Sequence, residues 1–133
     1  MRLTMGLLCG LALAGTGCGG GGGSDSALVS CTESENIGSG TLKICVETTA
    51  NERQALQQSC TQSSGGSGVG ITFADAPCSH VGALGACRVT AGGVVEDGWY
   101  YNIGSADAAG YVGETSADIQ MLCAEEGATF LPP

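Results

Sequence analysis

Six irregularly spaced cysteines constrain this chain more than any other feature. They are the last six of the eight cysteines in a sequence of 133 residues, namely Cys31, Cys45, Cys60, Cys78, Cys87 and Cys123. An even number of cysteines in a small exported domain is typical of a disulfide framework. Each bridge contributes ~2–4 kcal/mol, whereas the net stability of a whole domain is ~5–15 kcal/mol. We therefore expect three disulfides that dominate stability, with a connectivity that spacing alone leaves open.

Other uses of cysteine are disfavoured by the spacing. A structural zinc site would need close ligand pairs, but none of the six cysteines forms a C-x₂-C pair and the only histidine is His80. A redox-active pair is disfavoured for the same reason. No cofactor is indicated, and a formal net charge of −9 argues against a nucleic-acid partner, whose phosphates require a basic surface.

The first residues have the features of an export signal. One positive charge, Arg2, precedes an apolar run over 5–14. A run of about ten residues is the length of a signal-peptide core and half of the ~20 residues that a spanning helix needs. Because the signal precedes the cysteines, we expect the domain to be exported to an oxidising compartment.

The end of this apolar run, Gly15-Thr16-Gly17-Cys18, resembles the lipobox of bacterial lipoproteins. The aliphatic residue that usually lies three positions before the cysteine is Gly15 here. The resemblance implies cleavage before Cys18, acylation of that cysteine and attachment to the lipid bilayer. Gly19, where an aspartate usually signals retention in the inner membrane, implies the outer membrane. A plain secretory signal that leaves Cys18 unmodified is the alternative.

A glycine run follows Cys18 and ends at Ser24. Glycine side chains cannot offset the entropy of ordering the backbone by burying apolar surface, so this run is expected to be a flexible tether. The sequence thus predicts a signal peptide over 1–17, a lipidated cysteine with its tether over 18–30, and a cysteine-rich domain over 31–133.

The domain is predicted to be of the α+β class, with a small antiparallel sheet and two short helices. Alternating apolar residues predict strands over 41–47 and 69–73, and a further short strand is expected over 128–131. Between residues 87 and 103 the pattern indicates a meander with turns at Gly92-Gly93 and Asp97-Gly98. Capping boxes at Thr49 and Thr115 predict helices that each end near a cysteine and pin it to a common sheet.

The aromatic run Trp99-Tyr100-Tyr101 is the main candidate binding feature. Alternation along a strand places Trp99 and Tyr101 on one face and Tyr100 on the other, so at least one exposed ring is expected. Such a ring could contact a glycan or a protein, although core packing is the competing interpretation. His80 lacks a sequence motif that would supply catalytic partners, and the scattered acidic residues match no calcium loop.

The cysteine pattern is also similar to that of small cysteine-rich bacterial lipoproteins. The matching residues are Cys31, the segment 44–47 (Ile-Cys-Val-Glu), Cys60, Cys78, the segment 85–87 (Gly-Ala-Cys), Tyr100-Tyr101, Cys123 and the segment 127–130 (Gly-Ala-Thr-Phe). No activity comes with this resemblance. The sequence favours a non-enzymatic binding or structural module of the envelope, with a protein or glycan as partner. The alternatives are a hydrolase or hydrolase accessory that uses carboxylates, and a disulfide-rich protease inhibitor whose reactive loop is Ser79–Ala86.

Overall fold

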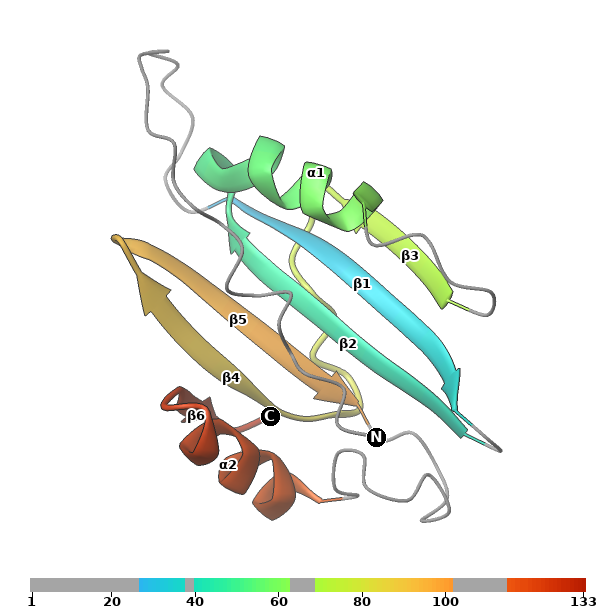
Figure 1. Cartoon of the computed structure of the whole chain (residues 1–133), viewed down its shortest axis with the longest axis vertical. Helices are drawn as coiled ribbons and strands as arrows, with labels where there is room; N and C mark the ends of the chain where they lie inside the picture. Colours follow the sequence, from blue (N-terminus) through green and yellow to red (C-terminus); the bar gives the residue numbers. More distant parts are fainter. Residues whose placement is uncertain (1–26, 38–39, 63–68, 102–114) are drawn as a thin grey trace.

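The strands form one antiparallel sheet that runs through the molecule (Figure 1). The structure, a computed structural model, describes residues 27–37, 40–62, 69–101 and 115–133. In these ranges the strands are β1 (Leu28–Ile37), β2 (Gly40–Thr49), β3 (Val69–Ala74), β4 (Ala83–Ala91), β5 (Val94–Tyr101) and β6 (Thr129–Leu131). Their order is β3-β1-β2-β5-β4-β6, so β3 and β6 are the edges. The helices are η1 (Ala50–Glu52), α1 (Arg53–Gln62) and α2 (Ser116–Glu125).

The register of the strands assigns each cysteine to a face of the sheet, because directly opposed residues point the same way. One row across the sheet contains Cys31, Val46, Gly98, Cys87 and Phe130. The adjacent row, on the opposite face, contains Thr32, Cys45, Trp99, Ala86 and Leu131. We call the first side the helix face and the second side the loop face.

Both helices lie on the helix face, each held by a disulfide. Cys31–Cys60 attaches α1 beside β1 and β3, and Cys87–Cys123 attaches α2 beside β4 and β6 (Figure 1). This confirms the expected disulfide-braced α+β domain, with both helices pinned to one sheet. Neither helix, at ten residues, is long and apolar enough to cross a bilayer, and the same holds for every helix in the described ranges.

The third disulfide, Cys45–Cys78, holds the segment 75–82 against the loop face. All six expected cysteines are therefore paired, which indicates an oxidising, extracytoplasmic environment. Alternation along β2 places Cys45 on the face opposite the apolar Val46, yet Cys45 is only 2% exposed, whereas Val46 on the helix face is partly exposed. The reason is that segment 75–82 covers the side of β2 that alternation alone would leave to solvent.

The two helix starts differ although their sequences look alike. Thr115 forms the predicted capping box with Asp118, which confirms the start of α2. Thr49 makes no side-chain capping bond, and the chain first turns through η1 before α1 begins at Arg53. The helix is where the sequence predicts it, but the capping box at Thr49 is wrong.

Two further expectations on chain organisation are corrected. The predicted hairpin turn at Asp97-Gly98 does not exist, because both residues lie within β5 and pair with Arg88 and Cys87 of β4. Gly92-Gly93 forms the only turn between these two strands. At the other end, β1 already begins at Leu28, so the folded domain includes three residues that were assigned to the tether.

Candidate functional site

The aromatic run is buried on both sides of the sheet. Alternation is confirmed, since Trp99 and Tyr101 join the core of the loop face and Tyr100 joins that of the helix face. The expected exposed ring is not found: Trp99 is 5%, Tyr100 2% and Tyr101 6% exposed. Both faces of β5 are covered, one by segment 75–82 and the other by the core that α2 builds. Trp99 and Tyr101 therefore lie beneath the site on the loop face, Tyr100 lies on the opposite face, and none of the three rings forms a surface.

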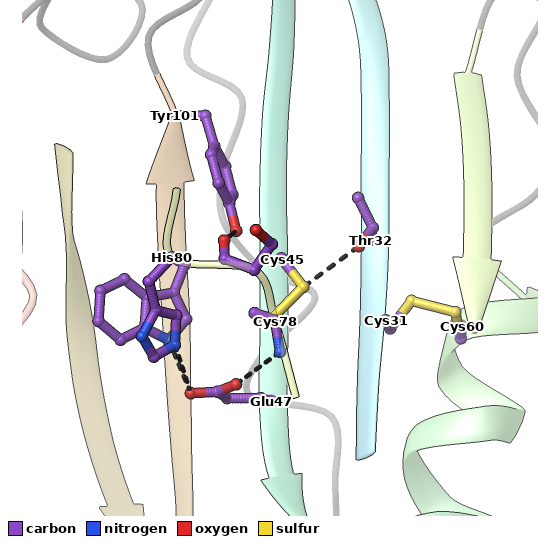
Figure 2. Close-up of a disulfide and its surroundings, with 10 residues drawn as sticks. Cys31, Thr32, Cys45, Glu47, Cys60, Cys78, His80 and Tyr101 are labelled. Carbon is purple, nitrogen blue, oxygen red and sulfur yellow. Dashed lines mark hydrogen bonds and ion pairs between the residues drawn. A yellow bond between two sulfur atoms is a disulfide. The ribbon is translucent and has the colours of Figure 1, made fainter. Parts of the chain in front are cut away.

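A buried carboxylate, Glu47, organises the loop face. Glu47 is 4% exposed, and its two carboxylate oxygens accept three hydrogen bonds (Figure 2). The Cys78 backbone N–H donates to Oε2 at 2.7 Å, and Trp99 Nε1 donates to Oε1 at 2.8 Å. His80 Nε2 lies 3.3 Å from the same Oε1. We call Glu47, Cys78, His80 and Trp99 the Glu47 cluster.

Charge around Glu47 is arranged in a row across the sheet. Asp97 lies directly opposite Glu47 on β5, and Arg88 lies opposite Asp97 on β4. Arg88 binds both Asp97 oxygens at 2.7 Å. The hydrogen bonds that Arg88 donates to Asp97 raise the pKa of Arg88, and the negative charges of Asp97 and Glu47 raise it further. A buried carboxylate is destabilising unless it is hydrogen-bonded or balanced by a positive charge. Cys78 and Trp99 supply the hydrogen bonds to Glu47, and Arg88 supplies the balancing charge to Asp97.

His80 is brought from segment 75–82 onto the ring of Trp99. The two ring centroids are 3.7 Å apart and the planes are inclined by 23°. The His80 side chain remains 48% exposed, whereas Glu47 beneath it is buried. An ionised carboxylate can only accept, so Glu47 selects the form of His80 that carries its proton on Nε2. In the neutral ring, Nδ1 is then an acceptor.

A tight turn follows His80 and carries the most exposed large hydrophobic side chain in the described ranges. The Ala83 N–H donates to the His80 carbonyl at 3.1 Å, and Gly82 has a φ of 77°, a value that suits the third position of a type II turn. Tyr101 Oη donates to the Ser79 carbonyl on the other side of the turn. Val81 at its tip is 88% exposed. The turn is thus held from below by the Glu47 cluster and by Tyr101.

The structure divides the segment Ser79–Ala86, the expected inhibitory loop. Residues 83–86 belong to β4, where Ala83 and Ala86 are 9% and 0% exposed, so only 79–82 is accessible. A protease binds its substrate as an extended strand, whereas this accessible part is a turn closed by an internal hydrogen bond. Two carboxylates for hydrolysis do meet, at Glu47 and Asp97, but both are buried and already bonded.

Sequence reasoning did not identify Glu47, although a signal for it exists. Glu47 is two residues after Cys45 and therefore shares its face of β2. A disulfide at Cys45 must bring a loop onto that face, and the carboxylate beside it becomes the natural acceptor for the loop's N–H groups. Cys18, the expected lipidation site, lies outside the described residues.

The site combines a carboxylate–histidine pair, a stacked indole and an exposed valine. Such a pair can orient a general base, but no hydroxyl or thiol in the described ranges is hydrogen-bonded to His80. What the arrangement does provide is a fixed, partly apolar projection with one ring nitrogen available to a partner. Comparison with known proteins finds no family model, no curated protein and no solved structure that matches the chain.

Proposed function

We propose that the protein is an exported lipoprotein, anchored to the outer membrane through acylated Cys18, that acts as a non-enzymatic binding module. The turn at residues 79–82 is its contact surface, and a protein of the envelope is its partner. The observation that carries this proposal is the pairing of high exposure at Val81 with rigid support beneath it. A preformed apolar projection loses little conformational entropy on binding, which favours affinity.

The chemistry of the turn defines what the partner must offer. Val81 requires a shallow apolar pocket, since its side chain is 88% exposed and makes no use of this chain's core. His80 adds a polar contact next to it, through the edge of the ring that Glu47 leaves free. Protein interfaces combine an apolar centre with hydrogen-bonding groups around it, and Val81 beside His80 supplies one of each.

The short linker between the lipid anchor and the domain supports this role. Nine residues lie between Cys18 and Leu28, the first residue of β1. A glycine-rich linker of that length has a mean span of roughly 15–20 Å at 5–6 Å × √n. Such a leash keeps the domain close to the bilayer, so partners in or near the same membrane meet it at high local concentration.

The anchor and the contact surface are tested separately. Mass spectrometry of the N-terminal peptide is expected to find diacylglycerol on Cys18, and the label must disappear in the Cys18→Ser variant. A free amino terminus before residue 18, or an unmodified thiol, contradicts the anchor but leaves the turn's role open.

For the contact surface, a photo-crosslinking amino acid replaces Val81 in cells that export the full chain. The matched control places the same group at Met121, an exposed apolar residue of α2 (61% exposed). We expect one defined adduct from position 81 that is absent from position 121 and is lost when His80→Ala is added. Equal adduct patterns at both positions contradict the proposal. If the protein hydrolyses a peptide or glycan and Glu47→Gln abolishes this turnover, the hydrolase is favoured instead. If the protein slows the cleavage of a substrate by a protease, the inhibitor is favoured.

A further inference from the structure

The two edges of the sheet are very unequal. β6 has three residues, whereas β3 has six and ends the sheet on the side of α1 (Figure 1). Within the part of the chain that the structure describes, no strand pairs with the outer side of β3. Alternate N–H and C=O groups of an edge strand point away from the sheet and can pair with another strand.

β3 itself lacks the charges, the proline and the bulge that protect many edge strands. Its sequence, Val-Gly-Ile-Thr-Phe-Ala, contains no charge and no proline. Its pairing with β1 runs in unbroken register from Val69 to Ala74, whereas the only register shift in the described sheet is in β4 at Ala83/Gly85. A long, regular and uncharged edge strand is a template for strand addition.

Electrostatic repulsion between two copies is weak at this edge. The chain has a net charge of −9, so copies repel one another over most orientations. Asp75, next to the end of β3, is neutralised by Arg53 at 2.6 Å. The acidic side chains of β1, Glu33 and Glu35, would be three strand spacings from those of a second copy, or ~14 Å, beyond the ~8 Å screening length of physiological salt.

The side chains of β3 are also self-complementary. Phe73 shares the helix face with Cys31, and Thr72 shares the loop face with Thr32. Because faces must match, a two-fold antiparallel pair is centred on a residue and not between two residues. Centred on Ile71, the pair places Val69 opposite Phe73 of the second copy on the helix face and Gly70 opposite Thr72 on the loop face. Aromatic and β-branched residues opposite one another are favourable cross-strand pairs.

We propose that two copies of this chain form a symmetric dimer in which their β3 strands pair antiparallel, edge to edge, around Ile71. The sheet then continues through both copies, and the exposed edges that remain are the short β6 strands. The two-fold axis is perpendicular to the sheet, so both 79–82 turns lie on the same side of the dimer. The dimer does not depend on what those turns bind.

The test is the molar mass of the full chain, with its disulfides formed, by sedimentation equilibrium in a density-matched detergent. Thr72→Lys places a charge on β3, and Thr129→Lys, the matched control, makes the same change on the opposite edge. Both threonines are exposed, and both variants change the net charge equally. We expect the wild type and Thr129→Lys to approach the mass of two chains between about 1 and 100 µM, and Thr72→Lys to associate at least tenfold more weakly.

Hydrogen exchange of the wild type supplies a measurement that needs no variant. Amides of β3 are expected to gain at least tenfold protection on going from dilute to concentrated protein, while amides of β6 do not change. A wild type that stays monomeric over the whole range, equal weakening by both lysine variants, or concentration-independent protection of β3 would each overturn the dimer.

Discussion

At the scale of single residues, the stability of the fold depends on a few positions where a change of one atom has a large effect. Gly85 is one of these. It lies at the register shift of β4 with a φ of 145°, and a Cβ there would be 2.5 Å from Phe130 Cε2 and 2.9 Å from the Leu131 carbonyl oxygen. The absence of a side chain at Gly85 is thus what allows β6 to close against β4.

Gly85→Ala is therefore expected to lower the free energy of unfolding by ~2–4 kcal/mol, from backbone strain plus overpacking against Phe130. Gly93→Ala is the control, because Gly93 also has a positive φ (86°) but a Cβ there would have nothing within 4 Å. It should lose only ~1 kcal/mol. Urea unfolding measures both, and equal losses would show that the contact with Phe130 is unimportant.

Glu47 is the second decisive residue. In Glu47→Gln, the amide oxygen can still accept from Trp99 and His80, but the NH₂ group then faces the Cys78 N–H, so two donors meet. We expect a loss of ~2–3 kcal/mol in the free energy of unfolding, since a buried donor is left unsatisfied. Because Trp99 is the only tryptophan, its emission should also move to longer wavelength as segment 75–82 loosens. Glu125→Gln, at an exposed carboxylate, should change neither quantity, whereas unchanged emission in Glu47→Gln would contradict the role of the cluster.

At the scale of elements, the sequence predicted what local chemistry decides. The strand at Val69–Ala74, the helix at Ser116–Glu125 and the final short strand at Thr129–Leu131 all occur where alternation and capping placed them. The predicted turn at Asp97-Gly98 is wrong because a cross-strand contact outweighs the local preference: Arg88 of β4 holds Asp97 in β5. The site could not be predicted for a related reason: the pairing of β2 with β5 brings Glu47 to Trp99, and the Cys45–Cys78 bridge brings the segment with His80 onto both.

The helix starts provide a prediction of their own at this scale. Thr115→Ala removes the hydroxyl that accepts from the Asp118 N–H and should lower the free energy of unfolding by ~1 kcal/mol. Thr49→Ala, at a start with a similar sequence but no capping bond, should stay within ~0.5 kcal/mol of the wild type. Thermal unfolding followed by circular dichroism distinguishes the two. Equal losses would mean that residue propensity, and not the cap, sets the effect.

At the scale of the whole molecule, the three disulfides link the sheet to α1, to segment 75–82 and to α2. Each bridge closes a loop of similar length, with separations of 29, 33 and 36 residues, so each restricts the unfolded chain by a similar ~3–4 kcal/mol. Their sum is comparable with the stability of an entire domain. The disulfides can be reduced by a thiol in denaturant, and the denaturant then removed. We expect the reduced protein to remain unfolded until the disulfides are formed again. A reduced protein with native circular dichroism and an unchanged melting temperature would show that the bridges are dispensable.

The excess of acidic groups also makes stability depend on pH in a direction that the structure fixes. Burial, reinforced by the charge of Glu52, raises the pKa of Glu96 above 4.5, and burial likewise raises the pKa of Glu33 and Glu126. In the pH window upward from 4.5, the folded state therefore holds protons that the unfolded state has lost, and the free energy of unfolding falls as the pH rises through this window.

Glu96→Gln imitates the protonated form, so at pH 7 it should be more stable than the wild type, and its stability should vary less between pH 4.5 and 7. Asp75→Asn is the opposing control: Arg53 lowers the pKa of Asp75, so this variant loses an interaction that is present at pH 7. Urea midpoints across this range measure both, and a wild type whose stability rises steadily from pH 4.5 to 7 would contradict the assignment of Glu96.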